Sequence, residues 1–125
     1  MKKRVLILED DQDTADILGF VIRQLNLDVV TSDRALFIPD IKRLSPDLIV
    51  SDHWLGTELG GDLCKALKSK ASTREIPVIL VSAAGNLPEI ALESQANAYL
   101  SKPFDINDLV ELTTSLIRRK KVSIA

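Results

Sequence analysis

Residues 5–11 read Val-Leu-Ile-Leu-Glu-Asp-Asp, so four consecutive aliphatic side chains are followed at once by three carboxylates. A short, uninterrupted aliphatic run is typical of a strand that is buried on both faces of a parallel sheet. The run therefore predicts a central strand, and the three acids predict a polar site where that strand ends.

The same strand pattern recurs along the chain and alternates with segments whose apolar residues have helical spacing. The predicted strands are Val5–Leu8, Asp28–Thr31, Leu48–Ser51, Val78–Val81 and Ala98–Leu100. Five βα units predict the α/β class: a doubly wound, mostly parallel sheet with helices on both faces and right-handed crossovers.

The helices are predicted from apolar residues that recur on one face. The first is expected to bury Ile17, Leu18, Val21 and Leu25, and the second Leu36, Ile41 and Leu44. The third is expected to bury Leu63, Cys64 and Leu67, the fourth spans Pro88–Ser94, and the fifth spans Ile106–Lys120.

Size and composition set the class of protein. A chain of 125 residues with 46% hydrophobic and 27% charged residues fits one globular domain, expected over residues 1–121 with a short tail at 122–125. The net charge of -2 argues against direct nucleic-acid binding, and the single cysteine excludes an internal disulfide framework. No apolar run approaches the roughly 18 residues of a membrane-spanning helix, so we expect a cytoplasmic protein without a membrane partner.

Polar residues follow four of the predicted strands: Glu9-Asp10-Asp11, Asp52, Ser82 and Lys102. In open α/β sheets, ligands bind beyond the carboxyl ends of the strands, where these residues should meet. Crowded carboxylates resist ionising together unless a cation compensates them, and oxygen-only ligands favour Mg²⁺. A carboxylate beside such an ion can attack phosphorus, while a lysine and a hydroxyl hold the phosphoryl oxygens.

The spacing of these residues resembles a known family over essentially the whole chain. Residues 5–11, 46–52, 76–83 and 98–104 resemble the four signature stretches of the receiver domains of two-component response regulators, which are CheY-like. The resemblance implies a flavodoxin-like (βα)5 sheet with strand order 2-1-3-4-5, Mg²⁺ as cofactor and phosphorylation of an aspartate. A receiver is not an enzyme in the ordinary sense, because it catalyses only its own phosphorylation and dephosphorylation.

The resemblance also implies a role for each matching residue. Asp52 is the expected phosphoacceptor, and the expected metal ligands are Asp10, Asp52, Glu9 through water, and the backbone carbonyl of Trp54. Ser82 and Lys102 are expected to bind the phosphoryl group, and Ser82 and Tyr99 to form the switch. Trp54 and Ala84 flank the pocket and are expected to set the lifetime of the phosphorylated form.

The partners expected of a receiver are proteins. The phosphoryl donor is a sensor histidine kinase or a phosphotransfer protein, and the output is a protein effector or an output domain outside this sequence. The protein is expected to be a monomer or a phosphorylation-dependent dimer that signals through the fourth helix, fifth strand and fifth helix. Stand-alone regulators, multidomain regulators and hybrid histidine kinases all remain open.

Three departures from the family pattern carry expectations of their own. Gly56 replaces the usual proline, so the loop 53–59 is expected to be more mobile, and Gln95 replaces a glycine before the fifth strand. The stretch from Ser82 to Lys102 is about two residues shorter than usual, which predicts a short or displaced fourth helix.

Other interpretations remain open for single residues and for the whole chain. Asp10, Asp11 and Asp13 are also typical of the start of a helix, Tyr99 of half-buried packing, and His53 of a solvated loop. A haloacid dehalogenase-type phosphohydrolase is the main enzyme alternative, although Asp11-Gln12-Asp13-Thr14 has its threonine one place early. A pseudo-receiver that no longer accepts phosphate is the alternative among binding modules.

Overall fold

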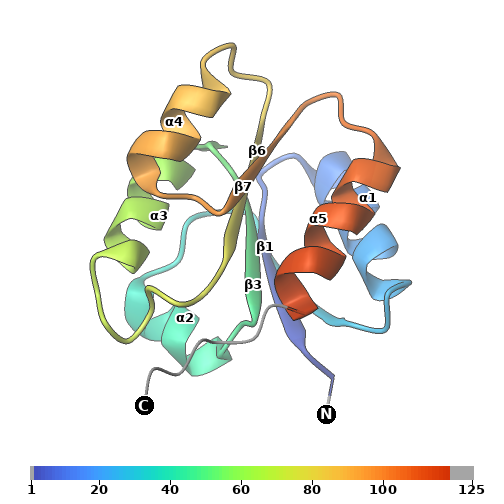
Figure 1. Cartoon of the computed structure of the whole chain (residues 1–125), viewed down its shortest axis with the longest axis horizontal. Coiled ribbons are helices and arrows are strands. Elements are labelled where there is room, and N and C mark those ends of the chain that lie inside the picture. The colour runs from blue at the N-terminus through green and yellow to red at the C-terminus, as the bar shows by residue number, and fades with distance from the viewer. Residues whose placement is uncertain (1, 119–125) are drawn as a thin grey trace.

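The computed structural model describes residues 2–118, so the tail expected at 122–125 and the last residues predicted for the fifth helix lie outside the described residues. Its main feature is a five-stranded parallel sheet in the order β2-β1-β3-β6-β7 (Figure 1). The strands are β1 Arg4–Leu8, β2 Asp28–Ser32, β3 Leu48–Asp52, β6 Val78–Ser82 and β7 Ala98–Ser101. Counted within this sheet alone, the strands have the predicted order 2-1-3-4-5, which confirms the doubly wound, flavodoxin-like fold.

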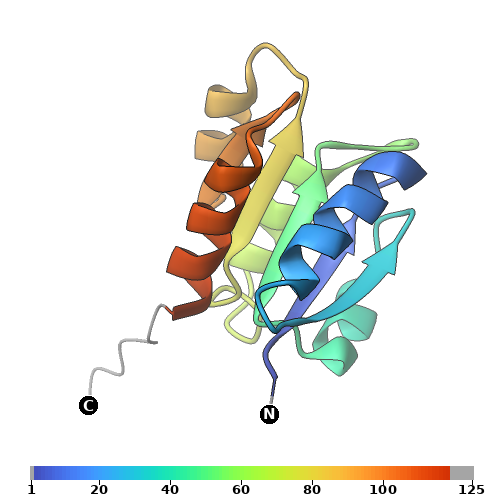
Figure 2. The same ribbon diagram turned by 90° about the vertical axis from the view of Figure 1, so that its right-hand side faces the viewer.

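Helices cover both faces of the sheet, as Figures 1 and 2 show. Helices α1 (Gln12–Arg23) and α5 (Ile106–Arg118) lie on one face. The other face carries α2 (Ile38–Leu44), α3 (Gly60–Lys68) and α4 (Leu87–Ser94). Among the described helices, none is both long and apolar enough to cross a membrane.

Each face of the sheet has its own apolar core, because successive strand side chains point to opposite faces. On β1, Val5 and Ile7 pack with Leu18, Ile22 and Leu109, beneath α1 and α5. Leu6 and Leu8 pack on the opposite face with Ile41, Cys64, Leu67 and Leu87. Burial on both sides explains why the strands read as continuous aliphatic runs.

The predicted buried face of the first helix is wrong in one position. Ile17 is 49% exposed, whereas Ala15, Leu18 and Ile22 are buried. These three residues follow the i, i+3, i+7 spacing of a helical stripe, and Ile17 lies about 100° away from Leu18 around the helix. The other apolar residues predicted for this face, Val21 and Leu25, are partly buried against the core.

The segment after β3, expected from the sequence to be a loop, forms a β-hairpin. Strands β4 (Trp54–Leu55) and β5 (Glu58–Leu59) pair antiparallel, with Trp54 opposite Leu59. Gly56 has φ 64°, and a glycine with positive φ at the first turn position is typical of a two-residue hairpin turn. The glycine that replaces proline is therefore required by this turn.

Candidate functional site

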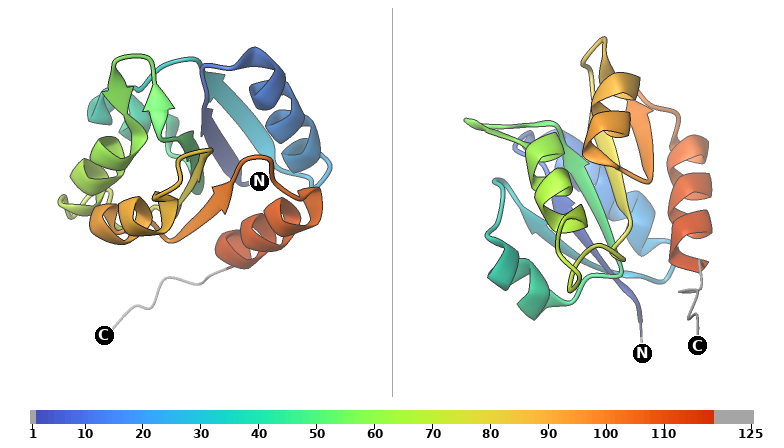
Figure 3. Two further views of the ribbon diagram at one scale, coloured as in Figure 1. Left: turned by 90° about the horizontal axis from the view of Figure 1, so that it is seen from above. Right: turned by 60° about the vertical axis from the view of Figure 1, so that its left-hand side comes forward.

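Strand pairing brings the polar residues together at the carboxyl end of the sheet, the end seen from above in the left panel of Figure 3. Glu9 and Asp10 directly follow β1, and Asp52 is the last residue of β3, which pairs with β1. Ser82 ends β6 and comes one residue after Val81, the register partner of Asp52. Parallel pairing thus makes neighbours of residues that are far apart in the sequence.

Three carboxylates at this edge form a cluster that could hold a metal ion. One oxygen each of Glu9, Asp10 and Asp52 lies within 4.8 Å of the others. Glu9 and Asp52 are buried and Asp10 is exposed, so the cluster opens to solvent on one side. Oε2 of Glu9 is buried and has no hydrogen-bond partner among the described residues. An unpartnered buried oxygen in an all-oxygen cluster fits a hard cation such as Mg²⁺.

Lys102 joins two of these carboxylates. Its Nζ donates to Oε1 of Glu9 at 2.5 Å and to Oδ2 of Asp52 at 3.0 Å. Its backbone N–H donates to the carbonyl of Ser82 at 2.9 Å, which fixes the segment that follows β7 against the end of β6. One ammonium group therefore faces the cluster, and it compensates only part of the negative charge.

The ionisation of the site reflects burial and crowding. Burial raises the pKa of Glu9 to about 7, and the neighbouring Asp52 adds to the rise while Lys102 opposes it. Burial lowers the pKa of Lys102, but its hydrogen bonds to Glu9 and Asp52 outweigh this and raise the pKa above its usual value. Lys102 is thus held in its charged form, whereas the charge on Glu9 depends on what else binds.

Asp52 is held by both of its carboxylate oxygens. Oδ2 accepts from Lys102, and Oδ1 accepts from the backbone N–H of Trp54 at 3.1 Å. The hairpin that begins at Trp54 presents this N–H, and Trp54 itself is 55% exposed. The carboxylate is therefore held in one orientation at the carboxyl end of the sheet.

The remaining predicted site residues are Ser82, Ala84 and Tyr99. Ser82 is fully buried, and its Oγ accepts from the backbone N–H of Ala84 at 3.2 Å. Ala84 is partly buried. Tyr99 lies on β7, the outer strand of the sheet, and is 45% exposed.

The interpretation of His53 as a solvated loop residue is wrong. Its side chain is only 6% exposed, and its Nδ1 accepts from the backbone N–H of Gly61 at 3.2 Å. Its carbonyl accepts from the N–H of Gly60 at 2.7 Å, and its ring packs edge-on against Trp54 with ring centroids 5.0 Å apart. His53 therefore joins the end of β3, the hairpin and the start of α3.

Gly60 allows that join. A Cβ atom on Gly60 would lie 2.1 Å from the carbonyl oxygen of Asp52, so the start of α3 packs directly against the peptide of Asp52. The pair Gly60-Gly61 after a buried strand is the sequence signal that could have indicated this close approach.

Asp11 does not belong to the acidic cluster. Its Oδ2 accepts from the backbone N–H of Thr14 at 3.0 Å and from the Thr14 hydroxyl at 2.5 Å, so Asp11 is the N-cap of α1. These hydrogen bonds lower its pKa. The helix-start interpretation holds for Asp11. A dehalogenase-type motif would need the side chains of Asp11 and Thr14, but these two side chains are hydrogen-bonded to each other at the start of α1.

Comparisons with known proteins indicate the family of the chain. A family model described as the response regulator receiver domain matches residues 5–114. The DNA-binding response regulator MtrA of Mycolicibacterium smegmatis is 29% identical over 124 residues, which cover 97% of this chain and 53% of that protein. The chain thus spans about half the length of the curated relatives it matches.

Solved structures show the same fold. A putative response regulator from Chloroflexus aurantiacus superposes with a TM-score of 0.86 at 27% identity and covers 95% of this chain and 100% of that one. The signal receiver domain of a signal transduction histidine kinase from Syntrophus aciditrophicus gives a TM-score of 0.80 at 26% identity, covering 98% of each chain.

Proposed function

The chain belongs to the response regulator receiver domain family of two-component signalling, and from this premise we propose that Asp52 is its phosphoacceptor. The observation that carries the proposal is the hydrogen bonding of Asp52: Lys102 holds one carboxylate oxygen and the N–H of Trp54 holds the other. The carboxylate is thereby oriented for attack, as a positioned nucleophile requires.

The cation site is part of the proposal. Asp10 and Asp52 would bind Mg²⁺ directly, Glu9 would act through water, and the carbonyl of Trp54 would complete the protein ligands. The unpartnered Oε2 of Glu9 and the cluster geometry support this set. When bound, Mg²⁺ supplies positive charge that lets the carboxylates ionise together and stabilises the phosphoryl oxygens.

The transfer follows from the positions of the side chains. An Asp52 oxygen attacks the phosphorus of a phosphohistidine, the P–N bond breaks, and the histidine leaves with the bonding electron pair. Lys102 exchanges one of its carboxylate contacts for a phosphoryl oxygen. The Ser82 hydroxyl gives up the hydrogen bond that it accepts from the Ala84 N–H and donates to a second phosphoryl oxygen. Water later hydrolyses the acyl phosphate, and Trp54 and Ala84 at the rim control its approach.

The output is a changed binding surface. Movement of Ser82 toward the phosphoryl group opens space into which Tyr99, now 45% exposed, turns inward. The surface formed by α4, β7 and α5 then shifts toward its active population. Trp54 and Ala84 determine how long that population lasts.

The partners follow from the family. We propose a sensor histidine kinase or a phosphotransfer protein as donor, in the cytoplasm, with residues 1–121 as one receiver domain, either monomeric or dimeric on phosphorylation. An output domain in the same polypeptide or a separate effector receives the signal. The receiver itself is not expected to contact nucleic acid, which its net charge of -2 supports.

The test is phosphorylation by acetyl phosphate, followed by intact mass. Wild type and Asp62→Asn, a matched change of an exposed carboxylate on α3, should each gain one phosphoryl group in the presence of Mg²⁺. Asp52→Asn should gain none, and chelation of Mg²⁺ should abolish the adduct. A folded wild type without an adduct, also with a phosphohistidine donor, would indicate a pseudo-receiver, and sustained turnover of a phosphate ester would indicate a phosphohydrolase.

A further inference from the structure

Strand β2 forms one edge of the sheet and has β1 as its only neighbour among the described residues. The backbone N–H of Asp28 donates to the carbonyl of Lys3, and the carbonyl of Ser32 accepts from the backbone N–H of Glu9. The backbone groups of Asp28 and Ser32 therefore face β1. Backbone groups alternate in direction along a strand, so those of Val29 and Thr31 point outward from the sheet. These outward groups can pair with a further strand.

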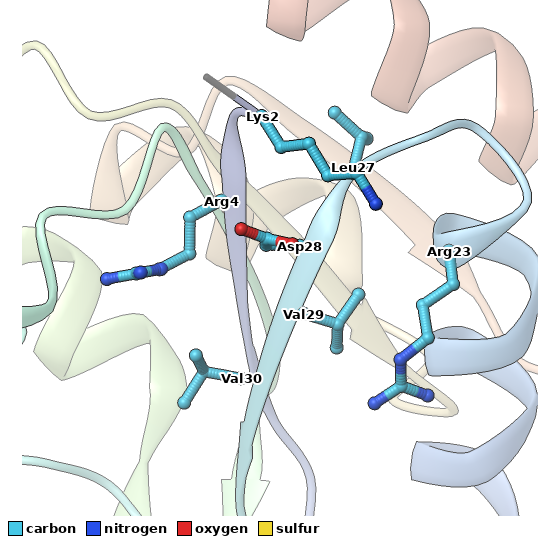
Figure 4. Close-up of a pocket in the computed structure, with 7 residues that line it drawn as sticks. All are labelled: Lys2, Arg4, Arg23, Leu27, Asp28, Val29 and Val30. Atoms are coloured by element: carbon cyan, nitrogen blue, oxygen red, sulfur yellow. The ribbon is translucent and has the colours of Figure 1, made fainter.

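A pocket of about 400 Å³ lies along this edge, lined by Leu27 to Val30 and by three basic side chains, Lys2, Arg4 and Arg23. Figure 4 shows Arg23 on one side of β2 with Val29, and Arg4 on the other side with Val30. The edge is thus open along its backbone and flanked by positive charge on both sides.

Most of this positive charge is uncompensated. Among the described residues, neither Lys2 nor Arg23 forms a salt bridge. The guanidinium group of Arg4 donates to the carbonyl of Leu44 at 2.7 Å, and its backbone N–H donates to Oδ2 of Asp47 at 2.8 Å. Asp28 is the one carboxylate that lines the pocket, against three cations. Cations that no salt bridge compensates, beside free backbone groups, favour an occupant that is both extended and acidic.

We propose that β2 binds an extended acidic segment of a partner protein by strand addition. The outward N–H and C=O groups of Val29 and Thr31 pair with the backbone of the added strand. Two consecutive acids in that strand point to opposite faces, so one meets Arg23 while the other meets Arg4. The backbone gives affinity, and the cations select acidic sequences.

A second copy of this chain fits the same edge less well. In an antiparallel pairing of two β2 strands, the residues that follow Ser32 of one copy would face the cations of the other. Those residues are Asp33 and Arg34, which are joined by a salt bridge of 3.2 Å and carry no net charge. Charged side chains at a sheet edge can also serve only to prevent pairing with other strands. If that is their role here, β2 should bind no peptide.

The probe is a capped peptide of alternating valine and threonine with two consecutive glutamates near its carboxyl end, added to ¹⁵N-labelled protein. The amide protons of Val29 and Thr31 should shift downfield as they form hydrogen bonds, whereas those of Asp28 and Val30, which already face β1, should move much less. A peptide with lysines in place of the glutamates should bind at least tenfold more weakly.

Charge reversal provides the matched variants. Arg23→Glu should weaken binding of the glutamate peptide about tenfold, and Lys65→Glu, an equal charge change on the exposed face of α3, should leave it unchanged. The proposal is overturned if the Val29 and Thr31 amides do not respond, if both peptides bind equally, or if the shifts map to the acidic cluster. It is also overturned if the protein pairs with itself through β2.

Discussion

The ammonium group of Lys102 lies 2.5 Å from Oε1 of Glu9, while the other oxygen of the same carboxylate, Oε2, is buried without a hydrogen-bond partner among the described residues. Among the described residues, only one of the two carboxylate oxygens of Glu9 therefore has a hydrogen-bond partner. Its second oxygen requires a proton or a cation, and this requirement links the stability of the fold to pH and to metal.

Without metal, the free energy of unfolding should fall as pH rises. Because the folded-state pKa of Glu9 is raised from 4.5 to about 7, the folded protein holds this proton more tightly than the unfolded chain does. The resulting stabilisation is complete below about pH 4.5 and is lost as pH rises through 7. Glu9→Gln mimics the protonated acid, so its free energy of unfolding should change little between pH 4.5 and pH 8. At pH 8 that free energy should exceed the wild-type value by no more than about 3 kcal/mol.

Urea unfolding with a chelator present, from pH 5 to pH 8, measures this difference. Glu89→Gln on the exposed first turn of α4 is the control and should follow wild type. Parallel curves for wild type and Glu9→Gln would contradict the assignment.

Removal of the Lys102 charge should strengthen Mg²⁺ binding and weaken phosphorylation. Lys102→Met takes a cation away from two of the proposed ligands, Glu9 and Asp52, so the carboxylates should attract a divalent ion about tenfold more strongly. The phosphoryl oxygens lose their lysine partner, so the rate of labelling by acetyl phosphate should fall. Titration of Trp54 fluorescence with Mg²⁺ measures the first effect, with Lys42→Met as control; weaker binding in Lys102→Met would contradict it.

Gly60→Ala should destabilise the protein by about 2–4 kcal/mol. A Cβ atom there meets the carbonyl oxygen of Asp52 at 2.1 Å, and neither α3 nor β3 can move without disturbing the core. Gly85→Ala adds a Cβ that meets nothing within 4 Å, so its denaturation midpoint should stay near that of wild type. Similar midpoints for both variants would show that the start of α3 is free to shift.

His53→Leu should lower the free energy of unfolding by about 1–3 kcal/mol, because it leaves the buried N–H of Gly61 without its acceptor. His53→Gln keeps an acceptor on a side chain of similar length and should recover part of the loss. Chemical denaturation of the three proteins gives the comparison. If leucine and glutamine are equivalent, the hydrogen bond contributes little, and packing against Trp54 explains the burial.

Gln95→Gly should stabilise the protein by about 1 kcal/mol. Gln95 follows the last turn of α4 with φ 63°, a conformation that costs free energy for any residue with a Cβ. Gln95→Ala keeps the Cβ and should bring no gain in thermal unfolding. Equal midpoints for the glycine and alanine variants would show that the left-handed turn is not strained.

The sequence by itself determined the class of fold and most of the candidate site. Continuous aliphatic runs identify strands buried on both faces, and the acids, hydroxyl and lysine that follow them need only the parallel pairing of β1, β3, β6 and β7 to converge. Strand periodicity and strand ends are local properties of the chain, so they can be read without coordinates. The family resemblance rests on those same positions.

Only the tertiary structure decided what depends on close approach between segments. Local pattern could not show that His53 is buried, since its burial requires α3 to dock on the peptide of Asp52 through Gly60. Nor could it separate Asp10, which joins the cluster, from Asp11, which caps α1. Neighbours in sequence take different roles here because the chain turns between strand and helix, and the direction of each side chain is set by that turn and by packing rather than by residue type.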